Sequence, residues 1–120
     1  MPATLYERLG GHDGITRLVT DIVDNHYRNP LIRTRFEQIK DRAAVERHSV
    51  ELLSAGSGGP QATTGRDRVT AHKGMNVSKQ ELIAAIDDIV MAMSKNPLDQ
   101  AVQNEVVAIL YSLKGDVVRL

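Results

Sequence analysis

Apolar residues recur along the chain at steps of three and four positions, which is the period of an α-helix with one buried face. The longest such run begins at Asp13 and is ended by Asn29-Pro30. Its inward positions are Ile15, Leu18, Val19, Ile22, Val23, His26 and Tyr27. No stretch alternates apolar and polar residues as a strand would, and no segment is repeated. The pattern therefore predicts an all-α fold in a single domain over residues 1–120.

Two helix starts carry the Ser/Thr-x-x-Glu capping box, Thr4-Leu5-Tyr6-Glu7 and Ser78-Lys79-Gln80-Glu81. The first helix is short because Gly10-Gly11 stop it, and the second continues with a buried face. That face comprises Leu82, Ile86, Ile89, Val90 and Met93. After Asn96-Pro97 a last helix is marked by Val102, Val106, Ile109, Leu110, Leu113 and Val117.

The middle of the chain combines a helix with a long loop. Asp41 can cap a helix running to about Ala55. Its inner face is expected to hold Val45, His48, Ser49, Leu52 and Leu53. Residues 56–65 read GSGGPQATTG, which is too long and too poor in apolar residues for a plain helix connection. Residues 66–73 can form only about two helical turns before Gly74.

The composition predicts an aliphatic core and argues against a nucleic-acid partner. Apolar residues make up 42% of the chain, but the only aromatics are Tyr6, Tyr27, Phe36 and Tyr111, so aliphatic side chains must fill the interior. A flat aromatic cofactor would supply the missing bulk. Fifteen basic and fifteen acidic residues give zero net charge, without the basic stripe that nucleic acids require.

The sequence also argues against a membrane protein and against thiolate chemistry. No stretch approaches the roughly 20 apolar residues that cross a bilayer, and the N-terminus lacks a signal pattern, so we expect a soluble, cytoplasmic protein. With no cysteine in the chain, disulfides and thiolate-bound metals are excluded. Histidine is the strongest metal ligand that remains.

Two histidines lie on helical segments that flank the glycine-rich loop. His72 follows the loop and is a candidate fifth ligand to haem iron, with Val69 and Met75 close in sequence as apolar wall. Arg66 and Arg68 lie at the same rim, where haem carboxylates would seek cations. His48, Tyr27 and Ser49 would face the open side of the iron. Each histidine taken alone also fits an ordinary surface or hydrogen-bonded role.

Several motifs occur in an order that resembles one family, the truncated (two-over-two helix) haemoglobins, and is most similar to their group I. These are Thr4-Leu5-Tyr6-Glu7-Arg8-Leu9-Gly10-Gly11, Tyr27, Phe36, Gly58-Gly59-Pro60, Thr64-Gly65-Arg66 and Ala71-His72-Lys73-Gly74-Met75. The resemblance spans nearly the whole chain. It implies a truncated globin fold, a two-over-two helical sandwich around haem b (iron protoporphyrin IX).

The resemblance also implies residue roles. His72 is then the proximal iron ligand, Phe36 packs on the haem plane, and Tyr27 donates a hydrogen bond to bound oxygen. His48 occupies a position from which some members bind the iron as a sixth ligand, and Ser49 stands where a distal glutamine is common. The residues expected to contact the cofactor are Phe36, Val45, His48, Leu52, Arg66, Arg68, Val69, His72, Met75 and Ile86.

Four departures from the family pattern bear on the distal side. The family's Phe-Tyr pair reads His26-Tyr27, a frequent Phe-Phe pair reads Arg35-Phe36, and the stretch between Tyr27 and Phe36 is shorter than usual. Without the distal glutamine, one donor is missing from the network that stabilises oxygen. Tyr27 is then expected to act with His48 or Ser49.

The leading hypothesis is a haem protein that reversibly binds oxygen, nitric oxide and carbon monoxide, for oxygen binding or transport. We expect a ligand-binding protein rather than an enzyme, in the form of a monomer or weak homodimer. Nitric oxide detoxification would need an external reductase, because no flavin or nicotinamide motif is present. The alternatives are a six-coordinate haem protein for electron transfer or redox sensing, locked by His48 and His72, and a helical interaction module without a cofactor.

Overall fold

The prediction of an all-α fold is confirmed in a computed structural model, which describes residues 3–59, 76–96, 98–116 and 118. The described elements are α1 (Leu5–Arg8), α2 (Gly11–Arg28), α3 (Arg33–Glu37), α4 (Arg42–Gly56), α6 (Lys79–Lys95), α7 (Gln100–Ser112) and the 3-10 helix η1 (Lys114–Asp116). Within these residues the only β pairing is an isolated bridge between Val77 and Val118. The helix expected over residues 66–73 lies outside the described part of the chain.

Local hydrogen bonds fix the predicted helix starts. At α1, Thr4 Oγ1 accepts from the backbone N–H of Glu7 at 3.1 Å, and the Glu7 carboxylate accepts in return. At α6, Ser78 Oγ accepts from the Glu81 N–H and the Glu81 carboxylate accepts from the Ser78 N–H, both at 3.0 Å. Both capping boxes predicted from the sequence are therefore present. Each satisfies amides that a helix start would otherwise leave unpaired.

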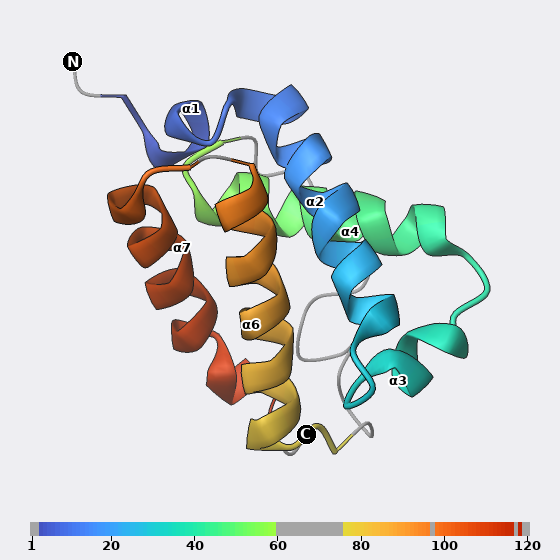
Figure 1. Ribbon diagram of the computed structural model, residues 1–120. Helices are drawn as coiled ribbons and strands as arrows, with labels where there is room; N and C mark the ends of the chain where they lie inside the picture. The colour runs from blue at the N-terminus through green and yellow to red at the C-terminus, as the bar shows by residue number, and fades with distance from the viewer. Residues whose placement is uncertain (1–2, 60–75, 97, 117, 119–120) are drawn as a thin grey trace.

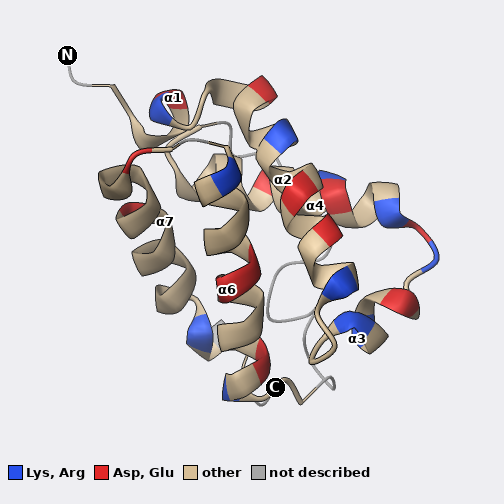
Figure 2. Cartoon of the chain, in the orientation of Figure 1, with Lys and Arg blue, Asp and Glu red and all other residues tan. Residues whose placement is uncertain are grey.

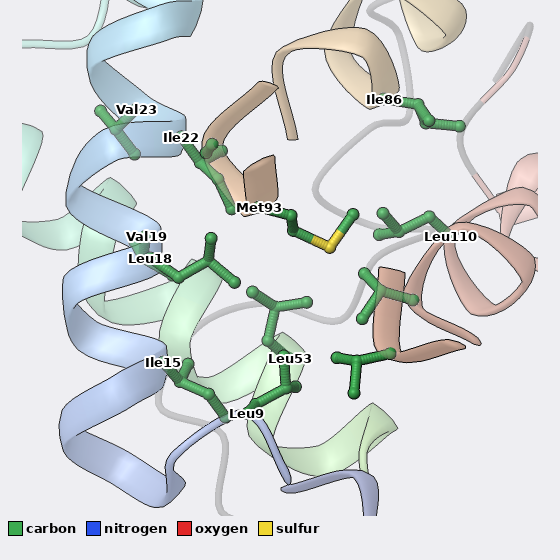
Figure 3. Close-up of a cluster of buried hydrophobic side chains, with 13 residues drawn as sticks. Leu9, Ile15, Leu18, Val19, Ile22, Val23, Leu53, Ile86, Met93 and Leu110 are labelled. Carbon is green, nitrogen blue, oxygen red and sulfur yellow. The ribbon is translucent and has the colours of Figure 1, made fainter. Parts of the chain in front are cut away.

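Helix α2 is the centre of the packing. It lies against both α4 and α6, and α6 runs beside α7 (Figure 1). The described core draws its side chains from Leu9, which follows α1, and from α2, α4, α6 and α7, and Figure 3 shows many of them converging around Met93. Its members are Leu9, Ile15, Leu18, Val19, Ile22, Val23, Leu53, Ile86, Ala92, Met93, Val102, Val106 and Leu110. As expected from the composition, this core is aliphatic.

The turn from α1 into α2 depends on glycine. Gly10 has φ +96°, a left-handed conformation that other residues rarely adopt. A Cβ placed on Gly14 would lie 2.2 Å from the carbonyl oxygen of Leu9, so only glycine lets the two segments approach this closely. Because of this turn, α2 begins at Gly11, two residues before the predicted start at Asp13.

One further boundary differs from the sequence prediction. The last helix, expected to reach Val117, ends at Ser112 and is followed by the short 3-10 turn η1. Phe36 lies on α3, a short helix of five residues. Basic and acidic residues are mixed along α2, α3 and α4 (Figure 2). No helix among the described residues is long and apolar enough to cross a membrane.

Candidate functional site

The predicted distal tyrosine lies at the end of α2, between an aromatic ring and a cation. The ring of Tyr27 is 5.9 Å from that of Phe36, with the planes tilted by 54°. On α4, the guanidinium of Arg42 lies 5.3 Å from the centre of the Tyr27 ring, within the range of a cation–π contact. The structure therefore brings together Tyr27 and Phe36, two of the residues that the resemblance assigns to the site.

Acidic residues hold Arg42 in this place. Arg42 Nη2 donates to the Asp24 carboxylate at 2.5 Å, and Arg42 Nε donates to Glu46 at 3.4 Å. The hydrogen bond to Asp24 is the main reason that the pKa of Arg42 is raised above its ordinary value. Because Asp24 belongs to α2 and Glu46 to α4, the guanidinium ties the two helices together beside Tyr27.

A second ion pair fixes α3, which carries Phe36. The guanidinium of Arg35 forms two hydrogen bonds with the carboxylate of Glu81 at the start of α6, one from Nε and one from Nη2, the latter at 3.1 Å. The Arg35 hydrogen bond is the largest cause that lowers the pKa of Glu81 to about 2. This pair was not foreseen, because the two residues are 46 positions apart.

The residue before Tyr27 is the clearest site residue that the sequence analysis missed. The apolar pattern places His26 on the buried face of the helix, but no functional role was assigned to it. In the structure it is 8% exposed, and its Nδ1 lies 2.8 Å from the carboxylate of Asp88 on α6. The imidazole also stacks on Phe36, with centroids 4.9 Å apart and planes within 15°. Its inward position in the apolar pattern and its alignment with a phenylalanine of the resembled family were the available signals.

The predicted distal residues of α4 are only partly brought to the site. Ser49 is half-buried, but its hydroxyl donates to the Val45 carbonyl at 2.9 Å, one turn earlier on the helix. His48 is exposed, so the expectation that it lies on the inner face is wrong in this structure. The rotation of α4 explains the difference, because its buried residues are Leu53 and Ser54, and a packed face directed toward these two leaves His48 at its edge.

The other predicted contact residues divide into described and undescribed ones. Val45 is half-buried against the core, and Ile86 is buried in it. Leu52 borders an apolar pocket of about 240 Å³ between α1, α4 and α7. The predicted residues Arg66, Arg68, Val69, His72 and Met75 lie outside the described residues. Their placement, including that of the proposed iron ligand, stays a prediction.

The described residues fit a flat apolar group better than a metal held by several carboxylates. Helices α4 and α6 both pack on α2, yet they make few contacts with each other. Apolar side chains on these two helices remain only half-buried beside the core, namely Val45, Val50, Leu82, Ile89 and Val90. In the described part of the chain, no group of three acidic or histidine side chains could hold a metal ion. Haem iron requires only one axial imidazole from the protein.

Comparisons with known proteins agree on one family. A family model described as bacterial-like globin matches residues 4–119. The group 1 truncated hemoglobin of Tetrahymena pyriformis is 24% identical over 115 residues, covering 96% of this chain and 94% of that protein. The crystal structure of truncated hemoglobin from the same organism, in its Fe(III) form, superposes with a TM-score of 0.92 at 23% identity, covering 98% of this chain and all of the other.

Two further solved structures share the fold. The 2/2 hemoglobin of Synechococcus sp. PCC 7002, in the cyanomet state with covalently attached heme, gives a TM-score of 0.86 at 23% identity and covers 96% and 98% of the two chains. The group II truncated hemoglobin of Bacillus anthracis gives 0.88 at 20% identity, covering 99% and 93%. These likenesses confirm the two-over-two helical fold predicted from the sequence.

Proposed function

Since the chain belongs to the bacterial-like globin family, as a haem-binding truncated (2/2) haemoglobin, we propose that it binds oxygen and other diatomic ligands at an iron held by His72. The observation that carries the proposal is the family match over residues 4–119. Haem, when bound, supplies an iron with one open coordination position for such a ligand. Because the chain has no cysteine, it cannot attach haem through cysteine thioethers, which favours haem b.

Two residues are proposed to act on the iron and on its bound ligand. His72 would coordinate the iron through a nitrogen of its neutral imidazole. Tyr27 is proposed to donate its hydroxyl hydrogen to the bound ligand from the distal side. In support, the Tyr27 ring is confined between Phe36 and Arg42, which limits the directions in which its hydroxyl can point. The apolar side chains of α4 and α6 would keep water from the site.

The first test is the absorption spectrum of the purified protein in oxidised, reduced and carbon monoxide-bound forms. We expect a Soret band and ready carbon monoxide binding, and we expect His72→Ala to lose or alter both. His12→Ala is the matched control, because His12 is exposed near the start of α2. A His72→Ala variant that keeps the pigment with an unaltered spectrum would contradict the proposal. Refusal of carbon monoxide by the wild-type protein would favour an electron-transfer role.

His48 is proposed as a sixth ligand only in a conformation that differs from the one described. Its exposed side chain would have to turn inward, and oxygen would then compete with it. The apparent oxygen affinity would fall by the fraction of time for which the site is closed. His48→Leu shows whether His48 binds the iron, through the absorption spectrum of the reduced, ligand-free protein. Identical five-coordinate spectra in wild type and variant would remove His48 from the mechanism.

A further inference from the structure

A buried polar cluster joins α2 to α6 beside the proposed distal tyrosine. His26 and Asp88 are 8% and 4% exposed, and the His26 Nδ1 lies 2.8 Å from Asp88 Oδ2. The side-chain amide of Asn29 donates to the other carboxylate oxygen at 3.1 Å, and that of Asn25 donates to the Asp88 backbone carbonyl at 2.9 Å. Both carboxylate oxygens therefore accept a hydrogen bond, as a buried charge requires.

The cluster fixes the orientation and the tautomer of His26. An ionised carboxylate can only accept hydrogen bonds, so His26 Nδ1 must carry a proton and donate it. Burial is the main cause that lowers the pKa of His26 below its ordinary value of 6.5, although the hydrogen bond to Asp88 opposes this effect. At neutral pH the ring is therefore uncharged, with its Nδ1–H directed at Asp88.

From this fixed imidazole, ring contacts lead to the distal tyrosine. His26 stacks on Phe36 at 4.9 Å with nearly parallel planes, and Phe36 packs on Tyr27 at 5.9 Å. On its other side Tyr27 meets the guanidinium of Arg42. A shift of His26 would thus be passed to Phe36, and a shift of Phe36 would release one of the two constraints on the Tyr27 ring.

We propose that His26 and Asp88 are positioning residues that fix Phe36 and, through it, hold the Tyr27 hydroxyl in its donor position toward a bound ligand. The inference rests on the proposed function, in which Tyr27 donates to that ligand. A phenylalanine ring at position 26 could stack on Phe36 but could not be held by a carboxylate. Through its hydrogen bond to His26, Asp88 of α6 therefore fixes a ring beside Tyr27.

Asp88→Asn tests the tether. A carboxamide has one acceptor and one donor group, so it can accept from His26 or from Asn29 but not from both. If it accepts from Asn29, its amide group faces His26 Nδ1, and this contact is lost unless the imidazole moves its proton to Nε2; in either case the Nδ1–H to carboxylate hydrogen bond is removed. We expect oxygen dissociation from the reduced holoprotein to accelerate about tenfold, as for loss of one hydrogen bond to the ligand. The C–O stretching band of the carbon monoxide complex should shift in the same direction as in Tyr27→Phe.

Two variants separate positioning from a general loss of structure. Asp87→Asn makes the same chemical change at an exposed neighbouring position of α6, and we expect oxygen dissociation to stay within about twofold of wild type. The double variant Asp88→Asn/Asn29→Asp restores a donor–acceptor pair, because a carboxylate at position 29 could accept from the new amide. It would also keep an oxygen for the Leu31 N–H, which donates to the Asn29 side chain at 3.0 Å. This variant should recover most of the wild-type C–O band.

A separate readout does not depend on ligand binding. In nitrogen-15 spectra of the full-length holoprotein, His26 should be neutral with the proton on Nδ1 at pH 7. If Asp88→Asn is too unstable to purify, His26→Phe keeps the stacking ring, removes the tether, and should show the same shift of the C–O band.

The outcomes distinguish this inference from the proposed function. Wild-type protein that takes up no haem or binds no carbon monoxide would refute the proposed function itself. Where Tyr27→Phe changes the C–O band and oxygen dissociation but Asp88→Asn and His26→Phe leave both as in wild type, only the positioning role is refuted. A His26 ring protonated on Nε2 alone, or a Tyr27→Phe variant identical to wild type, would also overturn it.

Discussion

The ion pair between Arg35 and Glu81 should make a measurable, pH-dependent contribution to stability. Glu81→Gln removes the negative charge but retains the length of the side chain. Glutamine also serves at this position of a capping box, so the hydrogen bond from the Ser78 N–H is kept. The substitution therefore isolates the charged contact that holds α3, and with it Phe36, against α6.

The magnitude follows from the pKa of Glu81. Lowering this pKa from 4.5 to about 2 would correspond to about 3 kcal/mol, at about 1.4 kcal/mol for each pH unit. Water screens the pair, because the side chains of Arg35 and Glu81 are 33% and 19% exposed. We therefore expect Glu81→Gln to lower the free energy of unfolding at pH 7 by about 1 to 2 kcal/mol.

The direction of the pKa change determines how the contribution of this ion pair to stability varies with pH. Since the folded state lowers the pKa of Glu81, the contribution is fully present above pH 4.5 and is lost as the pH falls toward about 2. Urea unfolding of the holoprotein followed by circular dichroism, at several values between pH 7 and pH 3, measures it. The difference between wild type and Glu81→Gln should shrink steadily below about pH 4.5.

Glu37→Gln is the matched control, because the Arg33–Glu37 pair lies within α3 and both its side chains are 57% exposed. It should change the free energy of unfolding by less than about 0.5 kcal/mol. If Glu81→Gln were as stable as wild type at pH 7, or if the two proteins differed equally at pH 7 and pH 3, the reasoning about this ion pair would be wrong.

Two further predictions concern the core. Met93→Ala should lower the free energy of unfolding by about 2 to 5 kcal/mol, because the side chain is fully buried at the centre of the core. Urea unfolding measures this loss. A loss below about 1 kcal/mol would mean that the surrounding residues collapse into the space left by the side chain. Gly14→Ala should lower the free energy of unfolding by about 1 to 3 kcal/mol, because the new Cβ would lie 2.2 Å from the Leu9 carbonyl oxygen. Thermal unfolding checks this. An unchanged midpoint would show that α1 can move away from α2 freely.

Features that depend on neighbouring residues were readable from the sequence. The two capping boxes were predicted at the correct residues, because their hydrogen bonds join positions only three apart. The buried face of α2 was also predicted, since a helix with one apolar stripe can bury only that stripe. The order of motifs carried the family resemblance, and with it the two-over-two fold that the structural comparisons confirm.

Contacts between distant parts of the chain were decided only by the tertiary structure. His26 and Asp88 are 62 positions apart, and nothing local marks Asp88 as buried or as the partner of an imidazole. The exposure of His48 likewise depends on how α4 is rotated against α2, which one histidine within a weakly patterned helix does not reveal. Local hydrogen bonding and periodicity thus determined the helices, whereas the packing angles between helices determined which polar groups surround Tyr27.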